Sequence, residues 1–385
     1  MLFLSELLSQ QGIEVVPFSM QDPRNLETPY SKFFVSPLDI HDPAKLSMGQ
    51  KVRGALRIFY SFEAKRKIRA LLQAKKVDVA HIHNIYNHIS PSILGELKKN
   101  GVKIVMTLHD YNLLSPNYSL FHHGKVHEED ARGWYGSCIK NKCVKDSTSG
   151  SMVAAAALVY HNKIMKFYEK YVDVFIAPSE CMRAMMVKYG WDAQKIVHIP
   201  NPLDAAQFEF FPEDDGTVVY SGRLSEEKGL AMVLEVAEHT PHIAYKIIGT
   251  GPMETELKHT VQEKNIQNVE FTGFKTGSEL KQLLQQARIH IVPSIWYENC
   301  PLSILEAKAL GKIVLASDSG GIPEMLPKHM LFTPGNVREC TEKIQYWHAA
   351  GAEQRYDEGQ KLRDEVLQKN NPDEYLQKVL ALYQD

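Results

Sequence analysis

The sequence predicts an α/β protein of two domains, each built around a parallel β-sheet, that face a cleft. Its 385 residues correspond to about two domains at ~150 residues each. Short runs of β-branched residues alternate with longer amphipathic segments, as in βαβ units. A break with two prolines, Ile199-Pro-Asn-Pro-Leu-Asp204, divides the strands into two series. Ligands of open α/β sheets bind beyond the carboxyl ends of the strands, so the cleft is the expected site.

Composition and charge restrict the class of protein. Hydrophobic residues make up 44% and charged residues 23% of the chain, which excludes disordered and fibrous proteins. The sequence contains no run of ~18 uncharged apolar residues, so it predicts no membrane span. The net charge of −2 and the lack of a known module argue against nucleic acid as a partner. Five scattered cysteines are too few for a disulfide scaffold, and the N-terminal segment lacks the pattern of a secretory signal. We therefore expect a cytoplasmic protein.

The first domain is expected to cover residues 1–199. An amphipathic helix is predicted over Leu2–Gln11, where Gly12 ends it. Five short apolar runs then predict its strands: Val15–Phe18, Val79–His83, Ile104–Leu108, Val174–Ala177 and Val197–Ile199.

The second domain, residues 200–371, continues the alternation. Its predicted strands are Val218–Ser221, Tyr245–Ile248, Val269–Thr272, His290–Pro293 and Ile313–Ala316. Its predicted helices are Gly229–Glu238, Met253–Lys264, Ser278–Ala287 and Ser303–Leu310. The strand runs are apolar at successive positions, as expected of parallel strands buried on both faces. A last helix, residues 372–385, is expected to pack back on the first domain.

The most informative stretch for function is Ser294–Met325. A loop with Glu298 follows a strand, and a helix follows with Glu306 in its first turns. The free N–H groups and the positive dipole end of a helix start favour a phosphate. The pair Gly320 and Gly321 permits close backbone approach to a ligand. The two carboxylates would accept hydrogen bonds from a sugar and from a ribose; alternatively, they are ordinary surface carboxylates.

A second motif, YSGRLSEEKG, follows another strand of the same domain. Gly222 ends the strand, and Arg223 and Lys228 lie in the loop after it. Two fixed cations at this edge would hold the phosphates of a nucleotide diphosphate and stabilise negative charge on a diphosphate leaving group. The alternative is a solvated loop in which Lys228 offsets the two glutamates that precede it.

Three further features point towards the cleft. Gly249 and Gly251 follow a strand in the sequence IIGTGP, which lacks the third glycine of a dinucleotide fingerprint. We expect these glycines to permit close approach of the backbone to a nucleoside; alternatively, they only form tight turns. Phe274, in FTGFK, would belong to the wall around the base. His109 follows a strand of the first domain and is expected to face the cleft, the alternative being a buried structural histidine.

With these motifs assembled, the chain resembles retaining glycosyltransferases of group 1, family 4, which have the GT-B fold of two Rossmann-like domains. The resemblance rests on SGRLSEEKG, GTGP, FTGF and Glu298-x7-Glu306 in this order and covers nearly the whole chain. The first half, with HIHN and TLHDYNLLSPNYSLF, is similar to bacterial members that build surface polysaccharides.

The resemblance implies transfer, with retention, from a nucleotide sugar such as a UDP- or GDP-sugar to a glycan or lipid-linked acceptor. It implies that His109 and Glu298 act at the donor sugar, and that Glu306 binds the ribose. The donor-binding positions that it implies are Gly222, Arg223, Lys228, Gly249, Gly251, Phe274, Asn299, Cys300, Pro301, Leu302 and Glu306. It implies no metal and no other cofactor, and the sequence contains no Asp-x-Asp.

The chain departs from this family at its start. Family members begin with a strand and a glycine-rich loop, whereas this sequence begins at the helix that follows them. We therefore expect the first domain to lack its usual first strand. Besides an active transferase, two alternatives stay open: a truncated or inactive relative that only binds nucleotide, and a sugar-nucleotide epimerase on the same fold.

A basic segment, Lys51–Lys76, contains nine basic residues and one acidic residue, Glu63. Apolar residues recur in it at helical spacing. This pattern predicts either a basic amphipathic face on an anionic membrane surface, which would place the protein peripherally at the inner face of a membrane, or a solvated helix. In the second case the helix would pack through Leu56, Phe59, Phe62, Ile68 and Leu71.

A segment rich in histidine and cysteine follows His109 in the first domain. It contains His122, His127, Cys138 and Cys143. A Cys-x4-Cys pair with nearby histidines would suit zinc, although the spacing fits no closed zinc module well. The alternative is a long loop beside the acceptor side of the cleft.

Overall fold

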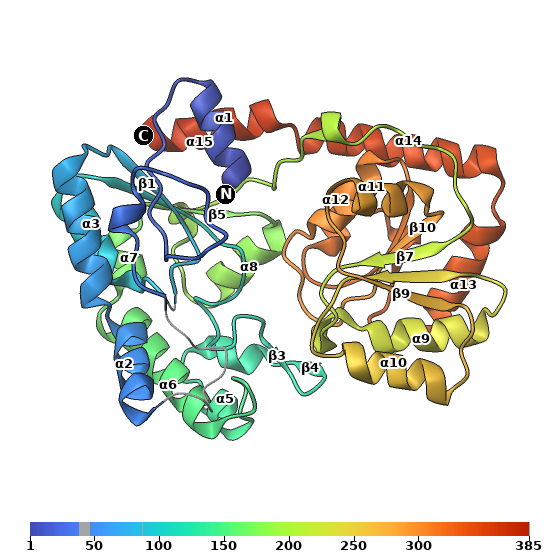
Figure 1. Cartoon of the computed structure of the whole chain (residues 1–385), viewed down its shortest axis with the longest axis horizontal. Coiled ribbons are helices and arrows are strands. Elements are labelled where there is room, and N and C mark those ends of the chain that lie inside the picture. The colour runs from blue at the N-terminus through green and yellow to red at the C-terminus, as the bar shows by residue number, and fades with distance from the viewer. Residues whose placement is uncertain (38–46, 87, 385) are drawn as a thin grey trace.

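The computed structural model describes residues 1–37, 47–86 and 88–384, and these residues form two parallel β-sheets side by side (Figure 1). The first sheet has the order β1-β2-β5-β6. Its strands are β1 (Val79–His83), β2 (Lys103–Thr107), β5 (Val174–Ala177) and β6 (Ile196–His198). The second sheet has the order β12-β11-β10-β7-β8-β9. Its strands are β7 (Val218–Ser221), β8 (Tyr245–Ile248), β9 (Val269–Gly273), β10 (Ile289–Val292), β11 (Ile313–Ser317) and β12 (Leu331–Phe332).

The predicted strands are confirmed to within one residue at either end, with one exception. The central strands are buried on both faces: Val218, Ile289 and Val314 are inaccessible to solvent. This explains why continuous apolar runs identify them. The sequence missed the two-residue strand β12 and an antiparallel hairpin, β3 (Phe121–His122) with β4 (Lys125–Val126).

The exception is Val15–Phe18, which is not a strand. Val16 and Phe18 are half-buried against the core of the first domain, so packing alone satisfies the apolar pattern. Among the described residues no strand pairs with their backbone, and the nearest pairing is a single bridge between Met20 and Val35. Within the described ranges, β1 is therefore the first strand of the first sheet.

Helices cover the faces of both sheets. Those of the first half are α1 (Leu2–Gln10), α2 (Met48–Phe59), α3 (Phe62–Ala74), α4 (Leu94–Lys99), α5 (Gly136–Lys140), α6 (Thr148–Val159), α7 (Phe167–Tyr171) and α8 (Glu180–Lys188). Those of the second half are α9 (Leu230–His239), α10 (Glu254–Glu263), α11 (Gly277–Gln286), α12 (Leu302–Ala309), α13 (Val337–Ala349), α14 (Ala352–Lys369) and α15 (Pro372–Gln384). The four helices predicted for the second half and the first helix of the chain are confirmed to within two residues at either end.

The C-terminal helix returns to the first sheet. After α14 has run along the second half, α15 lies beside α1 (Figure 1). Leu4 and Leu7 of α1 and Leu376 and Val379 of α15 are buried in one apolar cluster. Val105 of β2 belongs to the same cluster, so α15 helps to cover the first sheet.

The basic segment forms two helices rather than one, because the chain turns between α2 and α3. Ser61 caps the start of α3 by accepting the N–H of Ala64. Ile68 and Leu71 are buried as the solvated-helix interpretation requires, but Leu56 is 65% and Phe62 76% exposed. Most of the basic side chains bind groups of the chain itself: Arg57, Lys65, Lys67, Arg69, Lys75 and Lys76.

Within the described ranges, no helix has the length and apolar character needed to cross a membrane. The sequence did not predict a disulfide, yet Cys138 and Cys143 are joined by one. Cys181, Cys300 and Cys340 are free thiols.

Candidate functional site

Two oppositely charged side chains meet where neighbouring strands of the second sheet end. β7 and β10 are paired, so the loops that follow them emerge side by side. Lys228 belongs to the loop after β7 and Glu298 to the loop after β10. The Nζ atom of Lys228 lies 2.7 Å from Oε1 of Glu298. The expected phosphate-binding cation and the expected sugar-binding carboxylate are thus brought together, and Lys228 pairs with this distant carboxylate rather than with the glutamates beside it.

The surroundings of Glu298 hold its carboxylate in place. Oε1 also accepts a hydrogen bond of 2.5 Å from the hydroxyl of Ser294, and Glu298 is only 5% exposed. The Nζ of Lys228 lies 5.1 Å from the centre of the Trp296 ring, a cation–π contact. Both of these polar contacts go to Oε1.

The Gly-Gly pair packs on the Glu298 loop. Gly320 has a φ of 62°, and a Cβ there would overlap the backbone of Glu298. The N–H of Gly321 donates to the carbonyl of Glu298 at 2.7 Å. At these two glycines the chain packs closely on its own backbone, whereas the sequence predicted a close approach to a ligand. This packing positions the carboxylate of Glu298.

The second expected cation and the second carboxylate lie apart from this pair. Arg223 is separated from β7 by Gly222 alone, and its side chain is exposed, with no ion pair to the described part of the chain. Glu306 is half-buried on α12, and burial raises its pKa. It lines a small cavity together with Ser221, at the end of β7, and Ser303. Glu306 therefore lies near the end of β7 on the inside of the protein, and Arg223 follows the same strand end at the surface.

The glycines that were predicted to lie at the site allow two loops to pack closely against each other. Gly249 has a φ of 134°, and a Cβ there would overlap the carbonyl of Gly222. A Cβ at Gly251 would likewise overlap the backbone of Leu224. These glycines join the loop after β8 to the loop after β7. Phe274 follows β9 and is 71% exposed, so its ring is accessible. Contact of these residues with a nucleotide stays a prediction.

The side chain of Asn299 joins the two domains. Its Nδ2 donates to the carbonyl of Leu108 at 2.9 Å, and its Oδ1 accepts from the hydroxyl of Ser179 at 2.8 Å. Because His109 is the next residue after Leu108, this bond places the predicted catalytic histidine beside the Glu298 loop.

The three residues after Asn299 lead into α12. Pro301 is the N-cap of this helix, and Leu302 is its first residue and is 50% exposed. The carbonyl of Cys300 accepts a hydrogen bond of 3.4 Å from Asn201. Burial raises the pKa of the Cys300 thiol to about 11, so it is neutral at pH 7. The start of α12, with its free N–H groups, thus follows Glu298 after only a few residues.

His109 belongs to a row of histidines at the end of the first sheet. Its Nε2 lies 2.7 Å from Nδ1 of His83, and the His83 ring stacks on His81 with centres 4.6 Å apart. His81 makes 2.7 Å hydrogen bonds with the hydroxyls of Thr107 and of Tyr383 on α15. Burial lowers the pKa of all three histidines, to about 3 for His81. They are neutral at pH 7, so His109 can donate or accept a hydrogen bond.

Two more contacts cross between the domains beside this site. The hydroxyl of Tyr297 donates to Oε1 of Glu128 at 2.8 Å. The carboxylate of Glu324 accepts the backbone N–H groups of Glu180 and Cys181, at 2.8 and 2.6 Å. A carboxylate from the second domain thus caps the start of α8 in the first, where the helix dipole favours negative charge.

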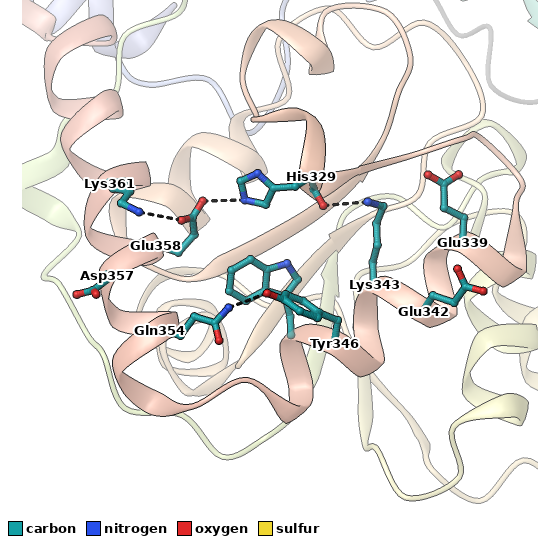
Figure 2. A pocket seen from close by; sticks show the side chains of 10 residues that line it. His329, Glu339, Glu342, Lys343, Tyr346, Gln354, Asp357, Glu358 and Lys361 are labelled. Atoms are coloured by element: carbon teal, nitrogen blue, oxygen red, sulfur yellow. Dashed lines mark hydrogen bonds and ion pairs between the residues drawn. The ribbon is translucent and has the colours of Figure 1, made fainter.

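A hollow of about 700 Å³ lies elsewhere, between α13 and α14 (Figure 2). Its polar side chains largely bind one another: Glu358 pairs with His329 and Lys361, and Gln354 donates to the hydroxyl of Tyr346. None of the site residues predicted from the sequence lines it.

Comparison with known families matches both halves of the chain. The sequence model of the family described as Glycosyltransferase Family 4 matches residues 1–207, more than half of the chain. The chain belongs to this family of glycosyltransferases. Residues 204–362 match the family described as Glycosyl transferases group 1.

Several curated glycosyltransferases are similar to this one. A phosphatidylinositol N-acetylglucosaminyltransferase subunit of Arabidopsis thaliana is 24% identical over 274 residues, which are 69% of this chain and 52% of that protein. The amylovoran biosynthesis glycosyltransferase AmsK of Erwinia amylovora is 33% identical over 168 residues, 40% of this chain and 41% of AmsK. The chain thus spans about half, or less, of the length of these curated relatives.

Solved structures show that this glycosyltransferase has the GT-B fold. Sucrose-phosphate synthase from Thermosynechococcus elongatus has a TM-score of 0.70 and 18% identity, covering 99% of this chain and 91% of that one. HepE from Anabaena, in complex with UDP-glucose, has a TM-score of 0.62 and 16% identity, covering 98% and 87%. The expected two-domain architecture and the expected family are confirmed.

Sequence reasoning missed several groups at the site of this glycosyltransferase. Ser294 and Trp296 are in the informative stretch but were given no role. Glu128 and Ser179 lie in the first domain, far from Tyr297 and Asn299 in sequence. Only the three-dimensional structure brings these partners together.

Proposed function

We propose that this glycosyltransferase moves a sugar from a nucleotide-diphosphate donor, such as a UDP- or GDP-sugar, to a hydroxyl of a glycan or lipid-linked acceptor, with retention at the anomeric carbon. The observation that carries the proposal is the buried Glu298 paired with Lys228 at the ends of adjacent strands. The relatives named as an amylovoran biosynthesis glycosyltransferase and as a phosphatidylinositol N-acetylglucosaminyltransferase subunit support the acceptor class. The neighbour bound to UDP-glucose supports the donor class.

In this proposal the cations act on the diphosphate. Lys228 and Arg223 follow β7, and the start of α12 lies after β10, so two cations and a helix start share one sheet edge with Glu298. Groups fixed in place before the reaction stabilise the charge that grows on a leaving diphosphate. Because these groups do the work of a divalent ion, we propose that the enzyme needs no metal or other cofactor.

The carboxylates bind hydroxyl groups in the same proposal. Oε2 of Glu298 would accept hydrogen bonds from the donor sugar, and Glu306 would accept them from the ribose. His109, which is neutral at pH 7 and beside the Glu298 loop, would face the reacting carbon. In this proposal, contacts between the domains around a bound donor would exclude water and so limit its hydrolysis.

The test combines binding with turnover. Calorimetry with UDP and GDP identifies the base, and an assay with matching nucleotide sugars and lipid-linked acceptors detects transfer. The anomeric configuration of the product, read by NMR, is expected to equal that of the donor. An inverted product would contradict retention. Nucleotide binding with no transfer would favour the inactive relative, and an epimerised nucleotide sugar formed without acceptor would favour the epimerase.

We further propose that the protein works at the anionic inner face of a membrane. Val52 and Leu56 on α2 and Phe62 on α3 are exposed apolar side chains, and Arg53 and Arg66 belong to the same helices. Apolar groups beside cations bind anionic lipid surfaces by insertion together with electrostatic attraction.

Sedimentation with vesicles tests the membrane proposal. The double variant Leu56→Glu with Phe62→Glu is expected to lose binding to vesicles of anionic phospholipid. Leu367→Glu, which changes an exposed leucine on α14, serves as the control and is expected to bind as the parent does. If the parent does not bind anionic vesicles, or the double variant binds equally well, the proposal is wrong.

A further inference from the structure

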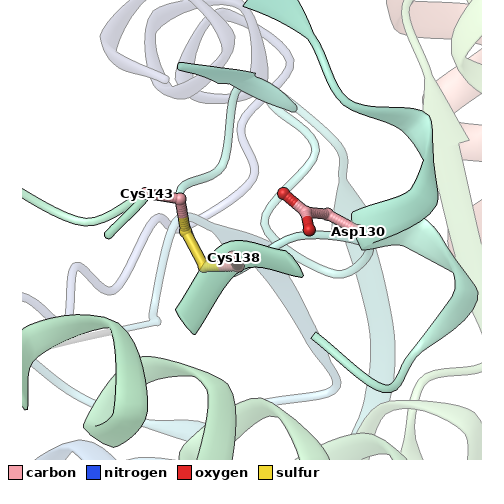
Figure 3. Close-up of side chains that lie close together, drawn as sticks. All are labelled: Asp130, Cys138 and Cys143. Atoms are coloured by element: carbon pink, nitrogen blue, oxygen red, sulfur yellow. A yellow bond between two sulfur atoms is a disulfide. The ribbon is translucent and has the colours of Figure 1, made fainter. Parts of the chain in front are cut away.

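A compact group of metal-ligating side chains lies outside the proposed donor site. Asp130 and the two cysteines Cys138 and Cys143 bring one carboxylate oxygen and two sulfurs within 4.8 Å of one another (Figure 3). The three residues come from η4 (Glu128–Arg132), from α5 and from the turn after it. The structure joins the two sulfurs in a disulfide.

The carboxylate of Asp130 is buried beside a histidine. Asp130 is inaccessible to solvent, and its carboxylate contacts the hydroxyl of Ser137 and, at 3.3 Å, Nε2 of His122. No lysine or arginine of the described ranges forms an ion pair with it. Burying a carboxylate away from water is costly unless a positive charge accompanies it.

His122 lies beside this group, with its Nε2 3.3 Å from the carboxylate of Asp130. His122 is 7% exposed, and its Nδ1 has no hydrogen-bond partner. The His127 ring stacks on it with centres 3.7 Å apart.

We propose that, in the reduced chain, Asp130, Cys138 and Cys143 bind one Zn²⁺ ion, and that His122, which contacts Asp130, shifts to become the fourth ligand. Two sulfurs, one nitrogen and one carboxylate oxygen form a donor set that zinc accepts in tetrahedral geometry. A dithiol reductant converts the disulfide to two thiols and is itself oxidised to a cyclic disulfide. Zn²⁺ then displaces both thiol protons to solvent and is bound by the two thiolates and the carboxylate, which leaves one net negative charge on the site.

The site would fix the loop that touches the second domain. Glu128 belongs to the same short helix as Asp130, and its carboxylate accepts the hydroxyl of Tyr297, beside Glu298. Lys188 and Tyr189 of the first domain hold the other oxygen of Glu128. Zinc would therefore secure the first-domain side of one contact between the domains. This role is independent of the proposed donor and acceptor.

The experiment uses the full chain, purified with a dithiol reductant and without chelator. Elemental analysis is expected to find about one zinc per chain, the content of a single four-ligand site. Replacing zinc with Co²⁺ is expected to give thiolate-to-cobalt charge transfer and the intense visible bands of a tetrahedral site. The variants Cys143→Ser and Asp130→Ala are expected to lose the metal, whereas Cys181→Ser, which changes a free thiol elsewhere, is expected to keep it.

Three results would overturn the proposal. The reduced parent would bind neither Zn²⁺ nor Co²⁺, or Cys143→Ser would keep a full complement of zinc, or the cobalt spectrum would lack thiolate bands. The cobalt titration needs only the parent protein, so it decides the question even where a variant does not fold. A parent that remains disulfide-bonded and metal-free in the reductant likewise contradicts the proposal.

Discussion

The variant Glu298→Gln separates two proposed effects of Glu298 on the donor, namely the neutralisation of Lys228 and the acceptance of hydrogen bonds from the sugar. In the structure Oε1 of Glu298 lies 2.7 Å from Nζ of Lys228, so the carboxylate neutralises the cation that is proposed to bind the diphosphate. Glu298→Gln keeps the shape and the contact with Ser294 but removes the negative charge. We expect the variant to bind UDP or GDP more tightly than the parent and yet to transfer sugar more slowly, because a neutral amide is a weaker acceptor for sugar hydroxyls.

The size of the binding gain follows from the geometry. A phosphate oxygen that approaches Nζ from the side opposite to Oε1 would lie roughly 5 Å from the carboxylate. Coulomb's law gives a repulsion of roughly 2–3 kcal/mol at that separation for an effective dielectric constant of ~20–40. Lys228 is partly exposed, so the lower value applies, and ~2 kcal/mol corresponds to about 30-fold in Kd.

Titration calorimetry of parent and variant with the same nucleotide measures this difference. The gain should shrink as salt rises, because salt screens the repulsion. Glu279→Gln is the matched control: Glu279 pairs with Lys275 at 3.2 Å on the surface of the same domain, and its removal should leave Kd unchanged. Equal or weaker nucleotide binding by Glu298→Gln would refute the proposed role of Lys228.

Three other perturbations follow from the structure. Asn299→Ala removes the acceptor of the buried Ser179 hydroxyl and the donor to the buried Leu108 carbonyl, and we expect urea unfolding to show a loss of ~1–3 kcal/mol in the free energy of unfolding. Gly320→Ala should lower the melting temperature by several degrees, because φ is 62° and a Cβ would overlap backbone, whereas Gly351→Ala, in open space, should not. The pKa of His81 is about 3 when folded and ~6.5 when unfolded, so the unfolded chain binds more protons between these values. The free energy of unfolding should therefore fall by up to ~1.4 kcal/mol per pH unit below about pH 6.5, and denaturation curves for His81→Gln should show a shallower fall.

The sequence predicted most of the sheets because parallel strands are buried on both faces. Val218–Ser221 and Tyr245–Ile248 have the predicted bounds, since each is an apolar run that ends at a turn. The same pattern misled at Val15–Phe18, because a strand needs a partner backbone and periodicity cannot show whether one is present. The strand Leu331–Phe332 was missed because two residues carry no pattern.

The site was predictable in part for a related reason. Residues that follow parallel strands lie at one edge of the sheet, so Lys228 and Glu298 were expected at the same edge. Their direct pairing depends on β7 being the neighbour of β10, and the order of strands is not written in the sequence. The role of Asn299 was beyond reach, because its partners Leu108 and Ser179 belong to the other domain.

The position of the site carboxylate depends on both domains. The residues on either side of Glu298 bind the first domain: Tyr297 binds Glu128, and Asn299 binds Leu108. These bonds exist only while the domains are closed, so opening would release the loop that holds Glu298 against its cation. A donor that adds contacts at this loop must therefore stabilise closure, and closure must strengthen donor binding by the same free energy. It follows that Asn299→Ala should weaken nucleotide binding, even though both hydrogen-bonding groups of that side chain are occupied by the protein itself.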